Sequence, residues 1–253
     1  MRRSPISVLH GCDPDENPFP AEQFAVTAQD MLVEHGYVHL TGLPDAFDPV
    51  SFGRELGPLM PHYNGTLVAE VRATGDTTYY PGSTRAFSPH TEGYDLVCLP
   101  PRYLALWCVR PTEGPGGQTT LADTTPWLER LDGPQRRHLE QFEYDWSNPH
   151  GEGLDTTVKH PVIETHDANT IVRFSCNNIV RNEDDVVAAL QRLWQEWYAD
   201  DHIEITYARN DMLIWDNWRM LHARNAHQDP NRHLRRIHIA TDAGRSDTTA
   251  PKG

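Results

Sequence analysis

The sequence predicts one mainly β domain, a jelly-roll sandwich with helices attached to it. Strand-like segments follow one another without the regular intervening helices that a parallel α/β sheet requires. The helical segments gather near the N-terminus and in two later insertions. A chain of 253 residues can bury a sizeable core, and an antiparallel sandwich is the architecture that this pattern favours.

The first third of the chain predicts helices and strands in alternation. Apolar residues at helical spacing predict a helix over residues 21–34, and Gly36 is a suitable C-cap for it. A β-rich run over 37–42 follows directly. The next expected elements are a helix over 50–56, a strand over 67–72 and a loop over 74–83.

The middle of the chain predicts two consecutive strands and then a helix. The nearly continuous apolar run 103–109 suits a strand buried on both faces. Residues 114–117, with Pro115, turn the chain into a second strand over 119–121. The following expected elements are a helix over 126–142, a long polar loop over 148–155 and strands over 161–164 and 170–176.

The clearest helix begins after residue 182. Asn182 is a natural N-cap, the acids 183–185 complement the helix dipole, and one apolar stripe faces the core. The stripe consists of Val186, Leu190, Leu193 and Trp197. Further strands are expected over 203–207, 212–215 and 234–240. We therefore divide the chain into an N-terminal extension (1–20), a single domain (21–242) and a disordered tail (243–253).

The composition excludes several functional classes. With 36 acidic against 22 basic residues the formal net charge is -14, and no run of Lys or Arg offsets it, so nucleic acid is not expected as a partner. No window approaches the roughly 18 consecutive apolar residues of a transmembrane helix, and no apolar stretch follows the N-terminal charges. We expect a cytoplasmic protein without a membrane partner. The four cysteines form no CxxC pair, which argues against a zinc knuckle or a disulfide framework.

His90 and Glu92 form a His-x-Glu pair, the first candidate for metal binding. Residues two apart on a strand point to the same face, so the imidazole and the carboxylate can meet one ion. Only this pair follows a loop with a proline and precedes a long strand-rich segment. The four other histidine–acid pairs at this spacing are His138/Glu140, His150/Glu152, His202/Glu204 and His227/Asp229.

The residues from Pro89 onward carry a family resemblance. The segments are, in order, PHTE, PRYLALWCVRP, GGQTTLAD, NDMLIWDNWRMLHARNAH and RHLRRIHIA. Their combination of HxE, GGxT, DN-x-x-x-LH and a final RxxxR resembles the clavaminate synthase-like branch of the taurine dioxygenase (TauD/TfdA) family of Fe(II)/2-oxoglutarate-dependent oxygenases. The resemblance covers most of residues 37–240 in order.

The resemblance implies a double-stranded β-helix with a facial triad of metal ligands. His90 and Glu92 would be the proximal ligands and His222, 132 residues later, the distal one. Three protein ligands leave three positions of an octahedral Fe(II) open, two for 2-oxoglutarate and one for O2. A glutamate at this position is similar to the subgroup acting on amino acids and their derivatives. Related halogenases carry a small residue there, so Glu92 disfavours halogenation.

The final strand would supply the cations that bind cosubstrate and substrate. Arg232, Leu234, Arg236 and His238 share one face of this strand. The RxxxR resemblance assigns Arg232 to the far carboxylate of 2-oxoglutarate, with Thr119 of GGxT assisting, and Arg236 to an anionic group of the substrate. Arg232 follows His222 by only ten residues, so a slipped register in which Arg236 holds 2-oxoglutarate stays open. Arg85 is a further candidate for the substrate site.

The resemblance implies an oxygenase that converts 2-oxoglutarate to succinate and CO2 and hydroxylates its substrate by default, with desaturation, cyclisation or epoxidation as open alternatives. That substrate would be a small molecule, an amino acid or an amino-acid-derived natural-product intermediate, free or tethered to a carrier protein. One rival is a non-redox jelly-roll metalloenzyme, an isomerase or hydrolase using Zn(II) or Mn(II), which would need neither Arg232 nor 2-oxoglutarate. Another rival is a non-catalytic β-sandwich binding module. The sequence does not specify an oligomeric state.

Overall fold

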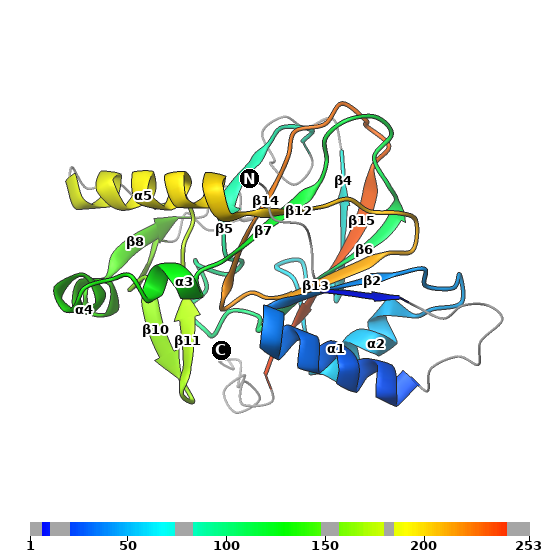
Figure 1. Ribbon diagram of the computed structural model, residues 1–253, viewed down its shortest axis with the longest axis horizontal. Helices are drawn as coiled ribbons and strands as arrows, with labels where there is room; N and C mark the ends of the chain where they lie inside the picture. The colour runs from blue at the N-terminus through cyan, green and yellow to red at the C-terminus, as the bar shows by residue number, and fades with distance from the viewer. Residues whose placement is uncertain (1–6, 11–20, 74–82, 148–156, 180–184, 242–253) are drawn as a thin grey trace, which may run out of the picture.

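Two β-sheets carry most of the strands in the computed structural model, which describes residues 7–10, 21–73, 83–147, 157–179 and 185–241 (Figure 1). The strands of the larger sheet are β1 (Val8–His10), β2 (Tyr37–Thr41), β13 (Met212–Asp216), β6 (Tyr103–Arg110), β15 (His233–Ile239) and β3 (Leu59–Met60) in spatial order, with β4 (Val68–Arg72) also paired to β15. The smaller sheet has the order β12 (Ile203–Ile205), β7 (Thr119–Asp123), β14 (Met220–Arg224) and β5 (Phe87–His90). Both sheets are antiparallel except where β1 joins β2.

The two sheets pack face to face over a shared apolar core. Leu106, Leu213 and Leu234 of the larger sheet meet Leu121 and Ile205 of the smaller one, and all five are buried. Consecutive strands β6 and β7 lie in opposite sheets, so the chain crosses the sandwich between them. These features confirm the predicted fold class, a mainly β double-stranded β-helix with attached helices.

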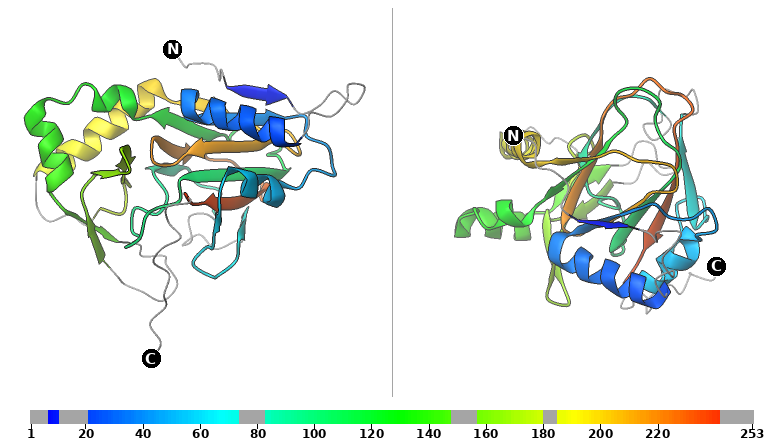
Figure 2. Two further views of the ribbon diagram at one scale, coloured as in Figure 1. Left: turned by 90° about the horizontal axis from the view of Figure 1, so that it is seen from below. Right: turned by 45° about the vertical axis from the view of Figure 1, so that its right-hand side comes forward.

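Two N-terminal helices cover the outer face of the larger sheet (Figure 2). Helix α1 (Ala21–His35) and helix α2 (Pro49–Leu56) bury their apolar faces against strands β2, β6, β13 and β15. The Asp48 side chain caps α2 by accepting a hydrogen bond from the Val50 amide at 2.9 Å. The larger sheet is therefore buried on both faces, which explains why its central strands are almost wholly apolar.

A third cluster of side chains lies beyond the smaller sheet. It packs α3 (Thr125–Leu128), α4 (Gly133–Gln141) and α5 (Asp185–Asp201) against the hairpins β8–β9 and β10–β11 (Figure 1). The hairpin strands are β8 (Tyr144–Ser147), β9 (Thr157–His160), β10 (Ile163–His166) and β11 (Asn169–Val172). Large aromatic side chains fill this cluster, including Trp146, Trp194 and Phe174, none of which is exposed. Among the described residues, no helix is long and apolar enough to cross a membrane.

Most expected elements appear in the structure, and two differ from expectation. The helix expected over 126–142 is divided into α3 and α4, because Asp132 and Gln135 form a capping box that begins a new helix. The strand expected over 170–176 ends at Val172. Beyond that residue the main chain turns to the β5 segment, where the Phe174 carbonyl accepts from the Thr91 amide at 2.8 Å.

The remaining differences concern two short strands and several segments outside the described residues. The strand β14 was not predicted, because its five residues, MLHAR, form neither a continuous apolar run nor a clear alternation of polar and apolar side chains. Residues 8–10 of the expected N-terminal extension form the edge strand β1. The loop at 148–155, the Asn182 cap and the tail at 243–253 lie outside the described residues, as does nearly all of the loop at 74–83.

Candidate active site

Strands β5 and β14 bring the two predicted histidine ligands together. The strands are antiparallel, and their register places His222 directly opposite His90. The two imidazole rings have centroids 4.0 Å apart, and both residues are buried. The Trp215 ring packs against His222 at 4.9 Å and is itself buried. One strand pairing thus brings together two histidines that are 132 residues apart in sequence.

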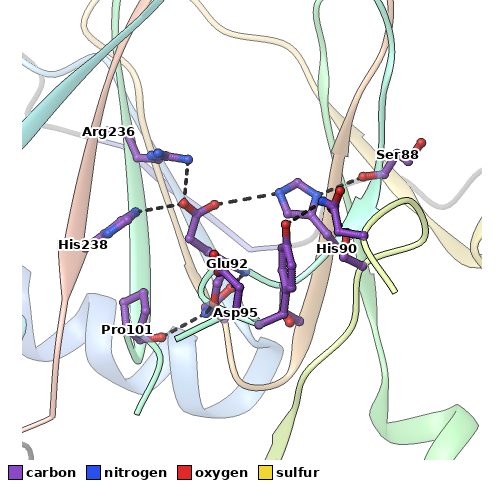
Figure 3. Close-up of polar contacts among 12 residues, drawn as sticks. Ser88, His90, Glu92, Asp95, Pro101, Arg236 and His238 are labelled. Atoms are coloured by element: carbon purple, nitrogen blue, oxygen red, sulfur yellow. Dashed lines mark hydrogen bonds and ion pairs between the residues drawn. The ribbon is translucent and has the colours of Figure 1, made fainter. Parts of the chain in front are cut away.

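Glu92 reaches the histidines from a turn. Strand β5 ends at His90, and Gly93, with φ of 75°, lies in the turn that follows. The expectation that a single strand presents both residues is therefore wrong, although their side chains still meet: His90 Nε2 lies 3.8 Å from Glu92 Oε2. Figure 3 shows the Glu92 carboxylate between His90 and the side chains of Arg236 and His238.

The triad presents three ligand atoms to one point. One atom from each of His90, Glu92 and His222 lies within 4.8 Å of the other two. The Nδ1 atom of His90 is 2.9 Å from the Ser88 carbonyl, which can only accept, so Nδ1 carries the proton and Nε2 keeps its lone pair. All three residues were predicted from the sequence, and the structure brings them together.

The protonation states of the triad suit metal binding. Burial lowers the pKa of His90, and it holds the pKa of His222 well below its ordinary value. Burial alone would raise the pKa of Glu92, but the neighbouring Arg236, His238 and His90 outweigh it and hold that pKa well below the usual range. The triad therefore offers two neutral imidazoles and one carboxylate, which is the form that a divalent metal requires.

This donor set fits a non-heme Fe(II). Two imidazole nitrogens and one carboxylate on one side of a metal leave the opposite positions open for other ligands, the arrangement that Fe(II) oxygenases use. The metal would lie between the two sheets. His90, Glu92 and His222 lie on or next to strands β5 and β14 of the smaller sheet, and β15 of the larger sheet supplies Arg236 and His238, which meet Glu92 from the opposite side. His238 was not predicted as a site residue, because its sequence position shows only that it shares a face of its strand with Arg236.

A second group of predicted residues surrounds Arg232. This arginine is only 3% exposed, yet no carboxylate pairs with it among the described residues. Its nearest polar neighbours include Tyr207, whose hydroxyl donates to Thr119 Oγ1 at 2.7 Å. A buried cation without an anion is costly, so an anionic ligand is the natural partner for Arg232.

The glycines of the GGxT motif make room for this group. A Cβ on Gly117 would lie 2.2 Å from Thr112 Oγ1, a clash, and 3.3 Å from Arg232 Cδ, a tight contact, so glycine leaves room for Thr112 and lets Arg232 pack close. A Cβ on Gly116 would lie 1.9 Å from the Ala226 carbonyl oxygen. Gly116 and Gly117 also have positive φ, 93° and 76° respectively, which other residues rarely adopt.

The other two predicted arginines differ in their surroundings. Arg236 is paired with Glu92, its Nη1 lying 3.0 Å from Oε1, and so belongs to the metal centre rather than to the Thr119 group. The Arg85 side chain is exposed. The Arg85 main-chain carbonyl accepts a hydrogen bond from the Arg224 guanidinium at 2.7 Å. The described contacts do not bring the Arg85 side chain to the triad.

The sequence of this chain matches a known enzyme family over most of its length. The model of the taurine catabolism dioxygenase TauD, TfdA family matches residues 11–238. The chain belongs to the TauD/TfdA dioxygenase family. Among relatives of this TauD/TfdA protein, gamma-butyrobetaine dioxygenases from Homo sapiens and Pongo abelii are each 27% identical over 225 residues, which is 80% of this chain. The chain spans 57% of the length of those relatives.

Solved structures share the fold of this TauD/TfdA protein at lower sequence identity. An asparagine oxygenase in complex with Fe(II), hydroxyasparagine and succinate has a TM-score of 0.74 at 18% identity, covering 88% of this chain and 80% of that one. The non-heme iron oxygenase OrfP, in complex with Fe and alpha-ketoglutaric acid, has a TM-score of 0.67 at 18% identity, with coverage of 88% and 83%. PvcB, an Fe, alpha-ketoglutarate dependent oxygenase from an isonitrile synthetic pathway, has a TM-score of 0.66 at 22% identity, with coverage of 93% and 86%. The resemblance found in the sequence is therefore confirmed.

Proposed function

We propose that this protein is an Fe(II)/2-oxoglutarate-dependent oxygenase that hydroxylates an amino acid or an amino-acid-derived small molecule. The observation that carries the proposal is the convergence of His90, Glu92 and His222 on one point, together with the buried cation Arg232, which has no carboxylate partner among the described residues. When bound, Fe(II) would allow O2 to oxidise 2-oxoglutarate to succinate and CO2 and a substrate C–H bond to be hydroxylated.

The site residues would have separate roles in binding the metal and the cosubstrate. His90, Glu92 and His222 hold the metal and leave its remaining positions to 2-oxoglutarate and O2. Arg232 binds the far carboxylate of 2-oxoglutarate in a charge-assisted pair, and the Thr119 hydroxyl donates to the same group. The apolar core around them, with Leu106 and Leu234, excludes water and strengthens those contacts.

Arg236 would serve the substrate rather than the cosubstrate. Its guanidinium already lies beside the metal ligand Glu92, whereas Arg232 lies beside Gly117 and Tyr207 of the Thr119 group. These surroundings favour the first arginine of RxxxR for 2-oxoglutarate over the slipped register. Arg236 keeps further N–H groups besides the one that meets Glu92, including Nε, which has no hydrogen-bond partner among the described residues, and these would meet an anionic group on the substrate, such as a carboxylate. Arg85 remains a proposed contact at the outer end of that site.

The substrate class is supported by the chemistry of the site and by the relatives. A cation beside the metal suits a substrate with a carboxylate. The similar proteins include an asparagine oxygenase, OrfP with bound hydroxyarginine and gamma-butyrobetaine dioxygenase, which all act on or bind small amino-acid-like molecules. We propose that the substrate arrives either free or tethered to a carrier protein.

We propose a cytoplasmic location, and the state of the described cysteines supports it. Cys98, Cys108 and Cys176 are free thiols, and unpaired cysteines are the usual state in a reducing compartment. A cytoplasmic location also gives the enzyme access to 2-oxoglutarate, an intermediate of central metabolism.

The decisive experiment is an anaerobic titration of the Fe(II)-loaded protein with 2-oxoglutarate, following the weak visible charge-transfer band of the chelate. We expect the band in wild type, a large rise in the 2-oxoglutarate Kd for Arg232→Ala and little change for Arg236→Ala. A larger rise for Arg236→Ala would reverse the two arginine roles. Metal binding without any band would instead favour a non-redox metalloenzyme, an isomerase or hydrolase, which has no use for Arg232.

A further inference from the structure

Two buried hydroxyl groups adjoin the proposed cosubstrate arginine. Tyr207 lies just beyond strand β12, and Thr119 begins strand β7, which pairs with β12. The Tyr207 hydroxyl donates to Thr119 Oγ1 at 2.7 Å, and the two residues are 8% and 3% exposed. Arg232 acts electrostatically on Tyr207 and packs against Gly117, two residues before Thr119. The hydroxyl pair therefore lies near a buried cation, with the buried His39–Asp211 pair on another side of the Tyr207 ring.

The direction of the hydrogen bond follows from the chemistry of the three groups. Burial raises the pKa of Tyr207, more than the nearby Thr119 hydroxyl and Arg232 charge lower it, so the phenol stays protonated and can donate. Arg232 has only donors and cannot accept from either hydroxyl. Thr119 Oγ1 accepts from Tyr207, which leaves the hydrogen of Thr119 to point elsewhere. Among the described residues, the Thr119 hydroxyl hydrogen has no hydrogen-bond acceptor.

The group thus has donors in excess and lacks an acceptor. Arg232 offers N–H groups without a carboxylate partner in the described part of the chain, and Thr119 offers one O–H. A carboxylate placed beside Arg232 would accept from both, since its two oxygens together have about four lone-pair sites. If Tyr207 were absent, the Thr119 hydroxyl would be free to rotate and would no longer be held in the donating orientation.

We propose that Tyr207 is a positioning residue that orients the Thr119 hydroxyl to donate to the far carboxylate of 2-oxoglutarate. The inference rests on the proposed function, because it takes 2-oxoglutarate as the ligand of Arg232. Tyr207 itself does not touch the carboxylate. Its effect is confined to ligands that carry a second carboxylate, so Tyr207 contributes to the choice of 2-oxoglutarate over 2-oxo acids with an apolar end.

The chain contains a matched control for this hydroxyl pair. Thr120, the next residue of β7, pairs its Oγ1 with the hydroxyl of Tyr198 at 2.6 Å, and both residues are buried. Successive residues of a strand point to opposite faces, so Thr120 faces away from Thr119 and toward helix α5, which carries Tyr198. Removing either phenol hydroxyl deletes one buried threonine contact, but only Tyr207 adjoins Arg232.

The test compares two cosubstrates in the anaerobic Fe(II)-loaded protein. 2-Oxopentanoate has the chain length of 2-oxoglutarate but ends in a methyl group, and the charge-transfer band reports the binding of both. Tyr207→Phe should raise the Kd of 2-oxoglutarate by about tenfold and leave that of 2-oxopentanoate unchanged, as expected for one weakened hydrogen bond to a charged group. Tyr198→Phe should change neither Kd.

A second comparison asks whether Tyr207 acts through Thr119. In a Thr119→Val background no hydroxyl remains to be oriented, so adding Tyr207→Phe should weaken 2-oxoglutarate binding no further. Additive losses would overturn the proposal, as would an equal loss for both cosubstrates or a loss of the same size in Tyr198→Phe. If wild type binds no 2-oxoglutarate at all, the proposed function itself fails, a result distinct from normal wild-type binding with an unaffected Tyr207→Phe.

Discussion

The side-chain amide of Asn217 holds the main chain of Glu92 at both of its polar atoms. Asn217 Oδ1 accepts from the Glu92 amide at 2.7 Å, and Nδ2 donates to the Glu92 carbonyl at 2.9 Å and to the Pro101 carbonyl at 3.0 Å. Asn217 is fully buried in the turn between β13 and β14, five residues before His222. One amide therefore joins the segment that carries one ligand to the segment that carries another.

We expect Asn217→Ala to weaken metal binding as well as folding. The substitution leaves the Glu92 amide and carbonyl without their partner, which costs about 1–3 kcal/mol for each buried group left unpaired. Loss of an outer contact to a metal ligand commonly reduces affinity by about 10- to 100-fold. Fe(II) titration and thermal unfolding measure the two effects. Asn210→Ala is the control, because its amide donates to the exposed Asp45, and unchanged Fe(II) affinity in Asn217→Ala would contradict the role.

Alanine at His90 or His222 should abolish stoichiometric Fe(II) binding. Two ligands cannot replace a facial triad, and the open side of the metal would take water instead. The matched control is His202→Ala, because His202 and Glu204 form another His-x-Glu pair whose side chains also lie 3.8 Å apart. Metal content after anaerobic loading distinguishes the two pairs. Full iron occupancy in His222→Ala would exclude His222 as a ligand.

Gly116→Ala should be far more damaging than Gly114→Ala. Both glycines have similar positive φ, 93° and 88°, so the backbone strain of an alanine is comparable at the two sites. An alanine Cβ at 116 would lie 1.9 Å from the Ala226 carbonyl oxygen, whereas at 114 nothing lies within 4 Å. We expect a loss of about 1 kcal/mol for Gly114→Ala and several times that for Gly116→Ala, measured by denaturant unfolding. Equal losses would show that the main-chain contact is unimportant.

Thiol labelling should separate the described cysteines by burial. Cys98 is exposed, whereas burial raises the pKa of both Cys108 and Cys176 to about 12. A thiol reagent at pH 8 should modify Cys98 in the folded protein and reach the other two only after unfolding. Cys98→Ser is the control that identifies the fast site by its loss. Rapid labelling of Cys176 in the native protein would contradict its burial.

The same thiols predict a direction for stability at alkaline pH. Because their folded pKa lies above the ordinary value of 9.0, the folded state favours the protonated form. The stability that they contribute is fully present below pH 9.0 and is lost as the pH rises toward 12. Denaturant unfolding between pH 8 and 11 should show this decline, and Cys176→Ala should reduce its slope.

The roles of Arg232 and Arg236 could be predicted from the sequence only in part. Alternation along β15 predicted that Leu234, Arg236 and His238 share a face, and the structure agrees: Leu234 enters the core between the sheets while Arg236 and His238 meet Glu92. The same alternation could not say which arginine lies beside Thr119. That depends on how β15 is placed against strand β7 of the smaller sheet, which begins at Thr119, more than 100 residues earlier in the chain.

The sequence by itself determined the class of fold and the order of the motifs. Apolar runs and turn residues are local signals, and they mark strands such as β6 and β13 wherever those strands pack. Residue types with ligand chemistry, arranged as HxE, GGxT and RxxxR, pointed to the family and to His90, Glu92 and His222 in the same way.

Only the tertiary structure decided which residues support that chemistry. Asn217 and Glu92 are 125 residues apart in sequence, and Tyr207 and Thr119 are 88 apart. No periodicity spans such distances, since the contacts arise from the packing of one sheet on another and from the register of β5 against β14. A buried amide or phenol looks like ordinary core in sequence, and its role becomes visible only when its hydrogen-bond partner is known.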